Sequence, residues 1–247
     1  MPPEKTASLI IIGNEILSGR TRDANLAFIG GRCDEIGIPL KEVRVIPDVE
    51  TEIVNNVNEL RARFDYVFTT GGIGPTHDDI TSASVAKAFG VVLERNAEAV
   101  AALQEYYADA SKLNEARLKM ADIPREALLI ENPLSGAPGF QLENVFVLPG
   151  VPLIMQAMFD GMRPRLTGGR PVHSESIQTD LTEGAVAAGL DTIQNNHPDV
   201  GIGSYPFFRK GTVGVNLVIR SVDKSSIMKA RADILALIQD LKGRVVE

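Results

Sequence analysis

Three short runs, each rich in β-branched residues and followed by a segment with helical spacing, constrain the fold of this chain most strongly. The runs and the helical segments alternate in the order 7–12, 26–36, 40–46, 53–60, 65–70 and 82–89. A β-α-β-α-β-α order predicts a mostly parallel sheet that is covered by helices on both faces. We therefore expect the first part of the chain to form an α/β domain.

The order of the predicted elements changes near residues 164–171, where Pro and Gly are frequent. The following segments read as β-α-β-β-α, which predicts a small α+β domain, with Thr182 as the cap of its first helix. The 247 residues suffice for an α/β domain of ordinary size and a small second one. We expect domains at 1–168 and 169–247.

The third strand runs directly into a glycine-rich loop at 71–79. Gly71, Gly72 and Gly74 allow backbone N–H groups to approach an anion, and the following helix presents its N-terminus to the same place. The loop has no Lys and no Gly-x-Gly-x-x-Gly spacing, which argues against a P-loop and a Rossmann dinucleotide site. In the simpler alternative, the loop is a tight turn and Asp79 or Thr81 caps the helix.

Carboxylates stand near this loop and after the second strand. Asp78 and Asp79 are adjacent, and Asp48 follows the second strand. Two carboxylates beside a phosphate repel it unless a cation lies between them, and Mg²⁺ commonly binds one or two carboxylates together with substrate phosphates. We predict that Asp48, Asp78 and Asp79 bind a divalent metal. Mg²⁺ is the favoured ion, and Mn²⁺ and Co²⁺ are the alternatives. Helix capping by Asp48 is the open alternative.

Composition narrows the class of partner. The net charge is −7 and no basic cluster is present, which disfavours nucleic acid. No apolar run approaches the roughly 18 residues of a membrane span, and the N-terminus does not resemble a signal peptide, so we expect a cytoplasmic protein.

The single cysteine, Cys33, excludes an intramolecular disulfide and is expected in the core. The aromatic run 205–210 is expected to pack rather than to stack on RNA.

Several motifs occur together in one order. They are Gly13-Asn14-Glu15-Ile16-Leu17-Ser18-Gly19, Thr69 to Thr81, Ala137-Pro138-Gly139-Phe140 and Leu148-Pro149-Gly150-Val151-Pro152. Over about residues 7–165 they resemble the N-terminal domain of the competence/damage-inducible protein A family. They resemble more distantly the molybdopterin-binding domain of molybdopterin adenylyltransferases and gephyrin. The resemblance implies a three-layer α/β/α molybdopterin-binding-like domain followed by a small KH-like domain.

The resemblance also implies the chemistry of the site. It places Asp48 and Asp79 as catalytic residues that face a nucleotide or pterin phosphate and a metal. We also expect an assembly of identical chains, with a dimer as the favoured state. The ligand-binding residues expected from the loops and motifs are Glu15, Ser18, Asn25, Gly71, Gly72, Gly74, Pro75, Thr76, His77, Pro149 and Gly150.

Three functions remain open from the sequence. The first is a metal-dependent pyrophosphatase that acts on ADP-ribose or a similar nucleotide diphosphate. The second is a protein that binds molybdopterin or another pterin phosphate without turnover, and the third is a molybdopterin adenylyltransferase. Residues 117–121 lack two amides that are frequent in the family, and His77 stands where Lys is frequent, which affects substrate identity. The chain ends at Glu247 without the deamidase domain of longer family members, so that activity is expected to be absent.

Overall fold

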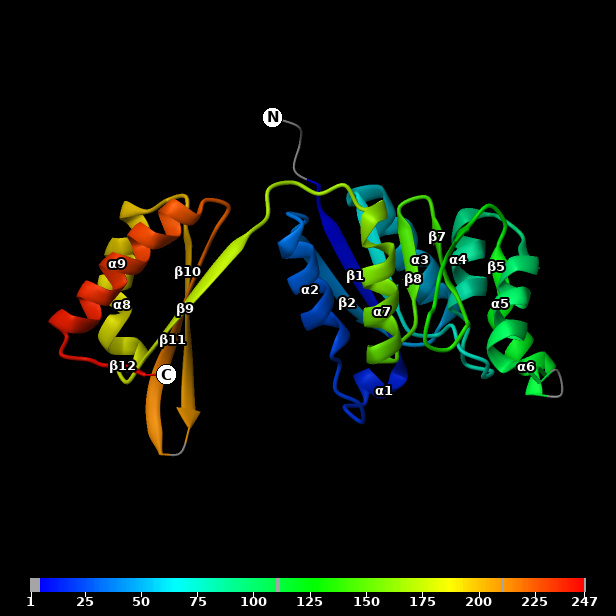
Figure 1. Cartoon of the computed structure of the whole chain (residues 1–247), viewed down its shortest axis with the longest axis horizontal. Helices are drawn as coiled ribbons and strands as arrows, with labels where there is room; N and C mark the ends of the chain where they lie inside the picture. Colours follow the sequence, from blue (N-terminus) through cyan, green and yellow to red (C-terminus); the bar gives the residue numbers. More distant parts are fainter. Residues whose placement is uncertain (1–4, 110–111, 210, 247) are drawn as a thin grey trace. The chain divides into compact units, whose positions relative to one another are not determined.

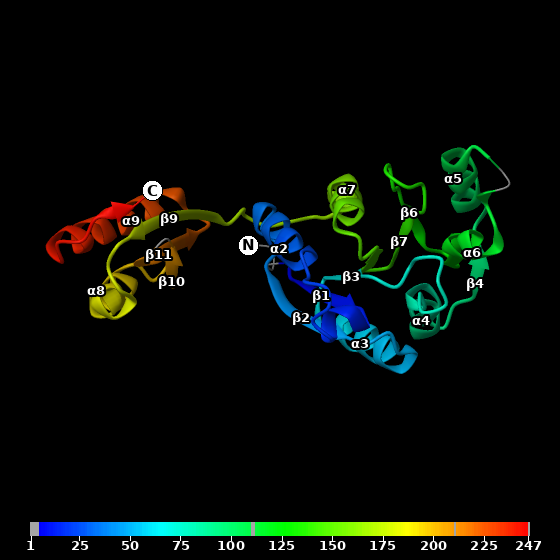
Figure 2. The ribbon, with the colours of Figure 1, turned by 90° about the horizontal axis from the view of Figure 1, so that it is seen from below.

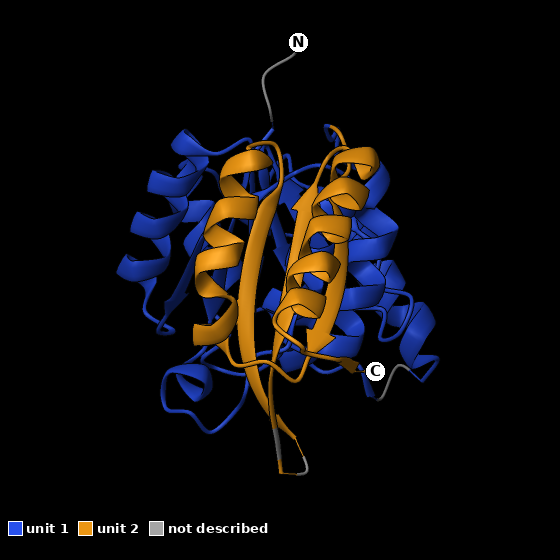
Figure 3. Cartoon of the chain, turned by 90° about the vertical axis from the view of Figure 1, so that its left-hand side faces the viewer, with its two compact units in different colours: residues 1–169 blue, residues 170–247 orange. Residues whose placement is uncertain are grey.

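The computed structural model describes residues 5–109, 112–209 and 211–246. The chain divides into two compact units, Met1–Gly169 and Arg170–Glu247, which Figure 3 shows in different colours. Each unit has its own hydrophobic core, and each is described here by itself.

The first unit is built on a six-stranded sheet with the order β2-β1-β3-β8-β7-β6. Its strands are β1 Ala7–Ile12, β2 Leu40–Ile46, β3 Tyr66–Thr70, β6 Leu128–Ile130, β7 Gly139–Leu142 and β8 Val145–Leu148. The pairs β1–β2, β1–β3 and β3–β8 are parallel, whereas β7 is antiparallel to both of its neighbours. The sheet is mostly parallel, as the alternation of strands and helices predicts, and its first three strands have the order 2-1-3.

Helices cover both faces of this sheet. They are α1 Asn14–Leu17, α2 Asn25–Glu35, α3 Glu50–Arg63, α4 Thr81–Phe89, α5 Ala97–Tyr107, α6 Glu115–Leu118 and α7 Pro152–Met162, with the short 3-10 turns η2 Lys119–Ala121 and η3 Arg163–Arg165. Figures 1 and 2 show α2 and α7 on one face of the sheet and α3 and α4 on the other. A three-layer α/β/α arrangement results.

Strand β1 shows why the layers form. All six of its residues are buried, and alternate side chains point to opposite faces of a strand. Leu9 and Ile11 pack in the core under α2 and α7, whereas Ile10 and Ile12 pack under α3 and α4. Cys33 lies in the first of these cores, as the apolar spacing of its helix predicts, and burial raises the pKa of its thiol to about 12.

The second unit is a four-stranded antiparallel sheet with the order β10-β11-β9-β12. Its elements are β9 His173–Thr179, α8 Glu183–Asn196, β10 Gly201–Arg209, β11 Thr212–Ser221, α9 Lys224–Asp240 and β12 Val245–Val246. Helices α8 and α9 lie on one face of the sheet and share its core (Figure 3). The predicted α+β domain is thus confirmed, with β12 as an added edge strand.

Some local expectations were wrong. The short strands β4 Leu93–Arg95 and β5 Asp122–Pro124, which pair with each other, lack any pattern that predicts them. The sequence predicts one helix over 113–120, which in the structure divides into α6 and η2. It also predicts a helix over 97–110, and Ala110, like Lys210 of the aromatic run, lies outside the described residues. Phe208 was expected to pack, but 74% of it is exposed.

Two predicted helix caps differ from the structure, and a third is confirmed in its position. Helix α3 begins at Glu50 with Val49 as its N-cap, so Asp48 does not cap it. The N-cap of α4 is Ile80, without a side-chain hydrogen bond, so neither Asp79 nor Thr81 caps that helix. Thr182 does hold the N-cap position of α8 but makes no capping hydrogen bond through its side chain. No helix within the described ranges has the length and apolar character needed to cross a lipid bilayer.

Candidate functional site

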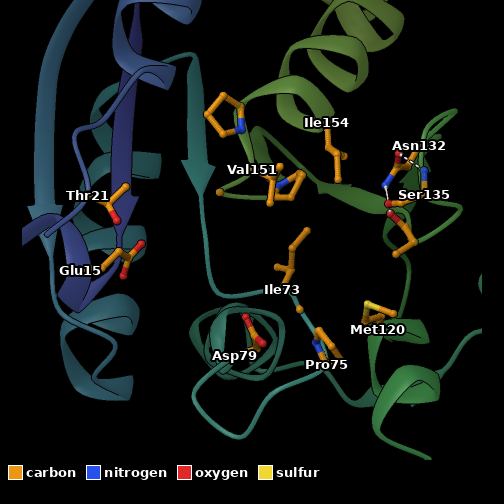
Figure 4. Close-up of a pocket in the computed structure, with 15 residues that line it drawn as sticks. Glu15, Thr21, Ile73, Pro75, Asp79, Met120, Asn132, Ser135, Val151 and Ile154 are labelled. Carbon is orange, nitrogen blue, oxygen red and sulfur yellow. Dashed lines mark hydrogen bonds between the residues drawn. The ribbon is translucent and has the colours of Figure 1, made fainter. Parts of the chain in front are cut away.

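A pocket of about 520 Å³ opens at the carboxyl ends of the parallel strands of the first unit. Figure 4 shows Glu15 and Thr21 on its β1 side, Asp79 and Pro75 from the glycine loop, and Asn132 and Ser135 on the opposite side. Ligands of open parallel sheets bind at this edge where the strand order reverses, and here that point lies between β1 and β3. The volume is within the range of small-molecule sites, about 300–1,000 Å³.

The first two glycines of the loop are required by packing within the protein. Gly71 has φ +104°, and a Cβ there would lie 2.1 Å from the carbonyl oxygen of Ile12. Gly72 has φ +68°, and a Cβ there would lie 2.2 Å from the Thr81 hydroxyl. Thr81 in turn donates from its hydroxyl to the Gly71 carbonyl at 3.0 Å and from its N–H to the Gly72 carbonyl at 2.9 Å. These glycines therefore allow the loop to pack against the end of β1 and the start of α4. Neither glycine lines the pocket.

Gly74 has a different role, because it makes room for an acidic side chain. A Cβ at Gly74 would lie 2.7 Å from Oδ2 of Asp79. The same Oδ2 accepts hydrogen bonds from the N–H of Thr76 at 2.7 Å and from its hydroxyl at 2.5 Å. The loop thus folds around the Asp79 carboxylate, and both Gly74 and Asp79 line the pocket.

The tip of the loop carries more charge. The Thr76 hydroxyl also lies 2.5 Å from Oδ1 of Asp78, so its single hydrogen is shared between the carboxylates of Asp78 and Asp79. Donation to Asp78 is the main reason that the pKa of Asp78 is below its ordinary value. Lys119 donates from Nζ to the Thr76 carbonyl at 2.5 Å. This contact fastens the η2 turn, which carries Met120, to the glycine loop. His77 and Asp78 are exposed and do not line the pocket.

Asp48 makes a hydrogen bond to the segment that follows β1. Its Oδ2 accepts a hydrogen bond of 2.8 Å from the N–H of Asn14, the first residue of α1. That short helix carries Glu15 into the pocket. The other carboxylate oxygen of Asp48 makes no hydrogen bond within the described part of the chain, and metal binding by Asp48 stays a prediction.

Asn132 organises the side of the pocket opposite Glu15. It is buried, and its Nδ2 donates to the Ser135 hydroxyl at 2.6 Å and to the Ala137 carbonyl at 2.8 Å. Its Oδ1 accepts from the N–H groups of Leu134 and Ser135. With all four positions satisfied, this amide fixes the loop 131–138. Apolar side chains, Ile73, Met120 and Ile154 among them, complete the wall.

The structure brings together part of the predicted site. Six of the predicted residues line the pocket, namely Glu15, Gly74, Pro75, Asp79, Pro149 and Gly150. Asn25 reaches it indirectly, through a hydrogen bond from Nδ2 to the Gly150 carbonyl at 2.9 Å. Ser18, Thr76 and His77 lie outside the lining, as do Gly71 and Gly72.

The predicted metal ligands do not form a preassembled cluster. Among the residues that the structure describes, no three His, Cys, Asp or Glu side chains lie together as a metal site. Glu15 and Asp79 are the two carboxylates that line the pocket. Two carboxylates suit Mg²⁺, which usually retains several waters and takes its remaining ligands from substrate phosphates.

Sequence reasoning missed the far side of the pocket. Asn132, Ser135 and Ile154 line that side, and Thr21 beside Glu15 was missed as well. The dipeptides Asn132-Pro133 and Ser135-Gly136 are turn signals. They predict a loop, but they do not reveal that it faces the glycine loop across a cavity.

The fold defines a class of protein, an α/β/α domain with a ligand-sized pocket at its strand ends, joined to a small α+β domain. Residues 8–168 match the family model of a probable molybdopterin binding domain, and residues 171–244 match that of the middle domain of FAD synthase. The chain therefore belongs to the molybdopterin-binding domain family.

Individual relatives agree with this assignment. The crystal structure of the protein CinA from Thermoplasma acidophilum is 38% identical, with a TM-score of 0.62, over 66% of this chain and 98% of that one. A protein from Archaeoglobus fulgidus is 34% identical over 94% of this chain and 97% of its own length. A probable FAD synthase from Caenorhabditis briggsae is 31% identical over 100% of this chain and 52% of its own length. The resemblance to the competence/damage-inducible protein A family is thus confirmed.

Proposed function

We propose that this chain is a metal-dependent pyrophosphatase that hydrolyses ADP-ribose or a similar nucleotide diphosphate. The observation that carries the proposal is the joint position of Glu15 and Asp79 in one pocket of about 520 Å³. The same pocket offers an apolar wall with Met120 and Ile154, suited to a planar ring, and the polar groups of Asn132 and Ser135.

The charge of the pocket supports a metal. Within the described residues, no Lys or Arg lines it, while two carboxylates do. A diphosphate would be repelled there unless a divalent cation lay between the two sets of oxygens. Glu15 and Asp79 would hold this ion, with Asp48 and Asp78 as the further predicted ligands. When bound, the ion would lower the pKa of a water and polarise the phosphoryl oxygens.

The hydrolysis needs a base for the attacking water. The water oxygen forms a bond to phosphorus, the P–O bond of the anhydride breaks, and ADP-ribose yields AMP and ribose 5-phosphate. We assign the acceptance of the water proton to Asp79. Its Oδ2 is held by Thr76, whereas Oδ1 makes no hydrogen bond within the described residues and remains available.

Relatives support nucleotide chemistry, because two of them are named probable FAD synthases and the second unit matches the middle domain of such enzymes. The match of the first unit to a probable molybdopterin binding domain favours a second candidate, a pterin-phosphate binder without turnover. A molybdopterin adenylyltransferase would use the same pocket.

A single panel separates these functions. Purified full chain would be incubated with ADP-ribose and related diphosphates in Mg²⁺, Mn²⁺ or Co²⁺, with a chelator as the control, while AMP release is followed by chromatography. Metal-dependent release of AMP supports the pyrophosphatase. Binding of a nucleotide or pterin phosphate without release supports the binding protein. Pyrophosphate release from ATP that depends on a pterin would identify the adenylyltransferase, and both of these results would contradict our proposal.

A further inference from the structure

A second, smaller cavity of about 60 Å³ adjoins the main pocket. The carboxyl ends of β1 and β3 and the start of α2 line it, and its polar lining consists of Glu15, Thr21, Arg22, Asp23, Asn25 and Thr70. Arg22 is exposed, whereas Asn25 and Thr70 are buried. Four residues, Glu15, Thr21, Gly150 and Pro152, line both cavities, so a ligand in the main pocket can extend into the smaller one. Figure 4 shows Glu15 and Thr21 at this side of the main pocket.

Two buried oxygens of this cavity lack partners. Asn25 is 3% exposed and Thr70 is 1% exposed. Neither Oδ1 of Asn25 nor Oγ1 of Thr70 has a hydrogen-bond partner among the described residues. Native proteins rarely leave buried polar groups unpaired, and such exceptions require an explanation.

The orientation of Asn25 is determined by its other contact. Its Nδ2 donates to the carbonyl of Gly150 at 2.9 Å, and a carbonyl can only accept. The amide therefore cannot be reversed, and the unpaired atom is an acceptor. The carboxylates of Glu15 and Asp23 are acceptors as well. One oxygen of Asp23 already accepts from the N–H of Leu26 at 2.9 Å.

A group that satisfies Oδ1 of Asn25 must therefore donate a hydrogen bond to it. The oxygens of an ionised phosphate only accept hydrogen bonds, so a phosphate would leave this buried acceptor unpaired. A cavity of about 60 Å³ corresponds to the volume of about two water molecules, or two hydroxyl groups. We propose that the cavity binds the vicinal diol of a ribose, with Asn25 and Thr70 as its hydrogen-bond partners. This inference rests on the proposed function, which supplies a ribosyl phosphate, and it adds the part of the substrate that is recognised.

The test uses ribose 5-phosphate and 2-deoxyribose 5-phosphate, which differ by one hydroxyl, with the full chain and ligand-detected NMR. A site built to bond a hydroxyl discriminates strongly against the analogue that lacks it, so wild-type protein should prefer ribose 5-phosphate by about tenfold or more. Thr70→Val is nearly isosteric and should reduce this preference to less than about threefold. Thr70→Ser keeps the hydroxyl and should restore it.

Thr69→Val is the matched control. Thr69 is also fully buried and its hydroxyl also lacks a partner among the described residues, but it points to the opposite face of β3 and does not line the cavity. Both valine variants should melt at or above the wild-type temperature, because each removes an unsatisfied hydroxyl. The control should leave sugar preference unchanged.

Several results would overturn the inference. They are the absence of ribose 5-phosphate binding, equal affinity of the wild type for the two sugars, an equal effect of Thr69→Val, and a Thr70-dependent response to K⁺ or Mg²⁺ alone without sugar preference. Because no turnover is measured, the outcome is independent of catalysis. A Thr70-dependent preference for ribose 5-phosphate without hydrolysis of ADP-ribose would support the diol site and contradict the pyrophosphatase activity. Hydrolysis of ADP-ribose without a preference for ribose 5-phosphate would support the activity and contradict the diol site.

Discussion

The carboxylate of Asp79 is held by Thr76 three residues earlier, through the backbone N–H at 2.7 Å and the hydroxyl at 2.5 Å. Both bonds end on the same oxygen, so the side chain has a fixed direction while its second oxygen remains available. Asp79 is consequently part of the loop and of the pocket at once, and substitutions can separate these two roles.

The first prediction concerns Asp79→Asn. The amide keeps an oxygen acceptor for Thr76, so the free energy of unfolding should fall by only about 1 kcal/mol. An amide is neutral and cannot serve as base or charged metal ligand, so the rate of AMP release should fall about 100- to 1,000-fold, at about 1.4 kcal/mol per tenfold. Turnover and thermal melts measure the two effects. Asp240→Asn, at an exposed position of the second unit, is the control.

Wild-type turnover in Asp79→Asn with an unchanged melt would remove Asp79 from the mechanism. It would leave this residue as a structural element of the glycine loop.

The second prediction concerns Gly74→Ala. The φ of Gly74 lies outside the left-handed region, so the backbone accepts alanine, but the new methyl would lie 2.7 Å from Oδ2 of Asp79. The carboxylate can rotate away, at a cost of at most about 1 kcal/mol in stability, and would lose its bonds to Thr76. Turnover should fall at least about tenfold. Gly30→Ala is the control, because a Cβ at Gly30 meets no atom within 4 Å.

Gly72→Val should behave differently from Gly74→Ala. A side chain at Gly72 meets the Thr81 hydroxyl at 2.2 Å in a left-handed conformation, so this variant should unfold more readily and its loss of activity would not identify the site. A stable Gly72→Val protein would show that the contacts of Thr81 rearrange at little cost.

The third prediction concerns acid stability. The pKa of Asp78 is below its ordinary value of 3.8, first because the Thr76 hydroxyl donates to it. A carboxyl with a depressed folded pKa stabilises the fold above its unfolded pKa, and this contribution is lost as the pH falls through the folded value. The difference in melting temperature between wild type and Thr76→Val should therefore shrink below about pH 4. A difference that stays constant from neutral to acid pH would contradict the assignment.

The fourth prediction concerns alkaline stability. Burial raises the pKa of the Cys33 thiol from 9.0 to about 12, so the folded state disfavours the thiolate. A raised folded pKa means that the contribution is complete below the unfolded value and is lost as the pH rises from about 9 through about 12. Cys33→Ala should be less stable at neutral pH but should lose less stability over this range. Rapid labelling of native Cys33 by a maleimide at pH 8 would contradict its burial.

The fifth prediction concerns the second unit. All residues that line the main pocket belong to Met1–Gly169, which has its own core. A fragment of residues 1–169 should therefore fold and bind ribose 5-phosphate with unchanged affinity. Calorimetry and circular dichroism measure binding and folding. A folded fragment that no longer binds would show that residues 170–247 contribute to the site.

Most of the fold could be predicted from local pattern. The strands β1 and β2 have their predicted bounds, 7–12 and 40–46, because a run rich in β-branched residues that ends at Gly or Pro defines a strand without knowledge of its partners. The pair β4–β5 could not be predicted, since each strand has three residues and gains its stability from pairing across 27 residues, as between Arg95 and Asp122.

The site was predictable only where a motif carried it. Glycines and acids identified the loop 71–79, but Gly71 and Gly72 serve contacts with Ile12 and Thr81 rather than the ligand. Asn132 was missed for a different reason. Local dipeptides predict the turn that its hydrogen bonds stabilise, but they do not encode the position of that turn across the cavity from the glycine loop.

The attachment of β8 to β3 also has a consequence for biosynthesis. Gly71 donates from its N–H to the carbonyl of Leu148, and Asn144 donates to the carbonyl of Phe64, 80 residues earlier. Closing such a long loop has an entropic cost that must be met before these contacts form. On the ribosome, the glycine loop therefore lacks its contact with Leu148 until the residues of β8 have emerged. Prematurely terminated chains that end before residue 145 should be captured by chaperones or proteases instead of acquiring a binding site.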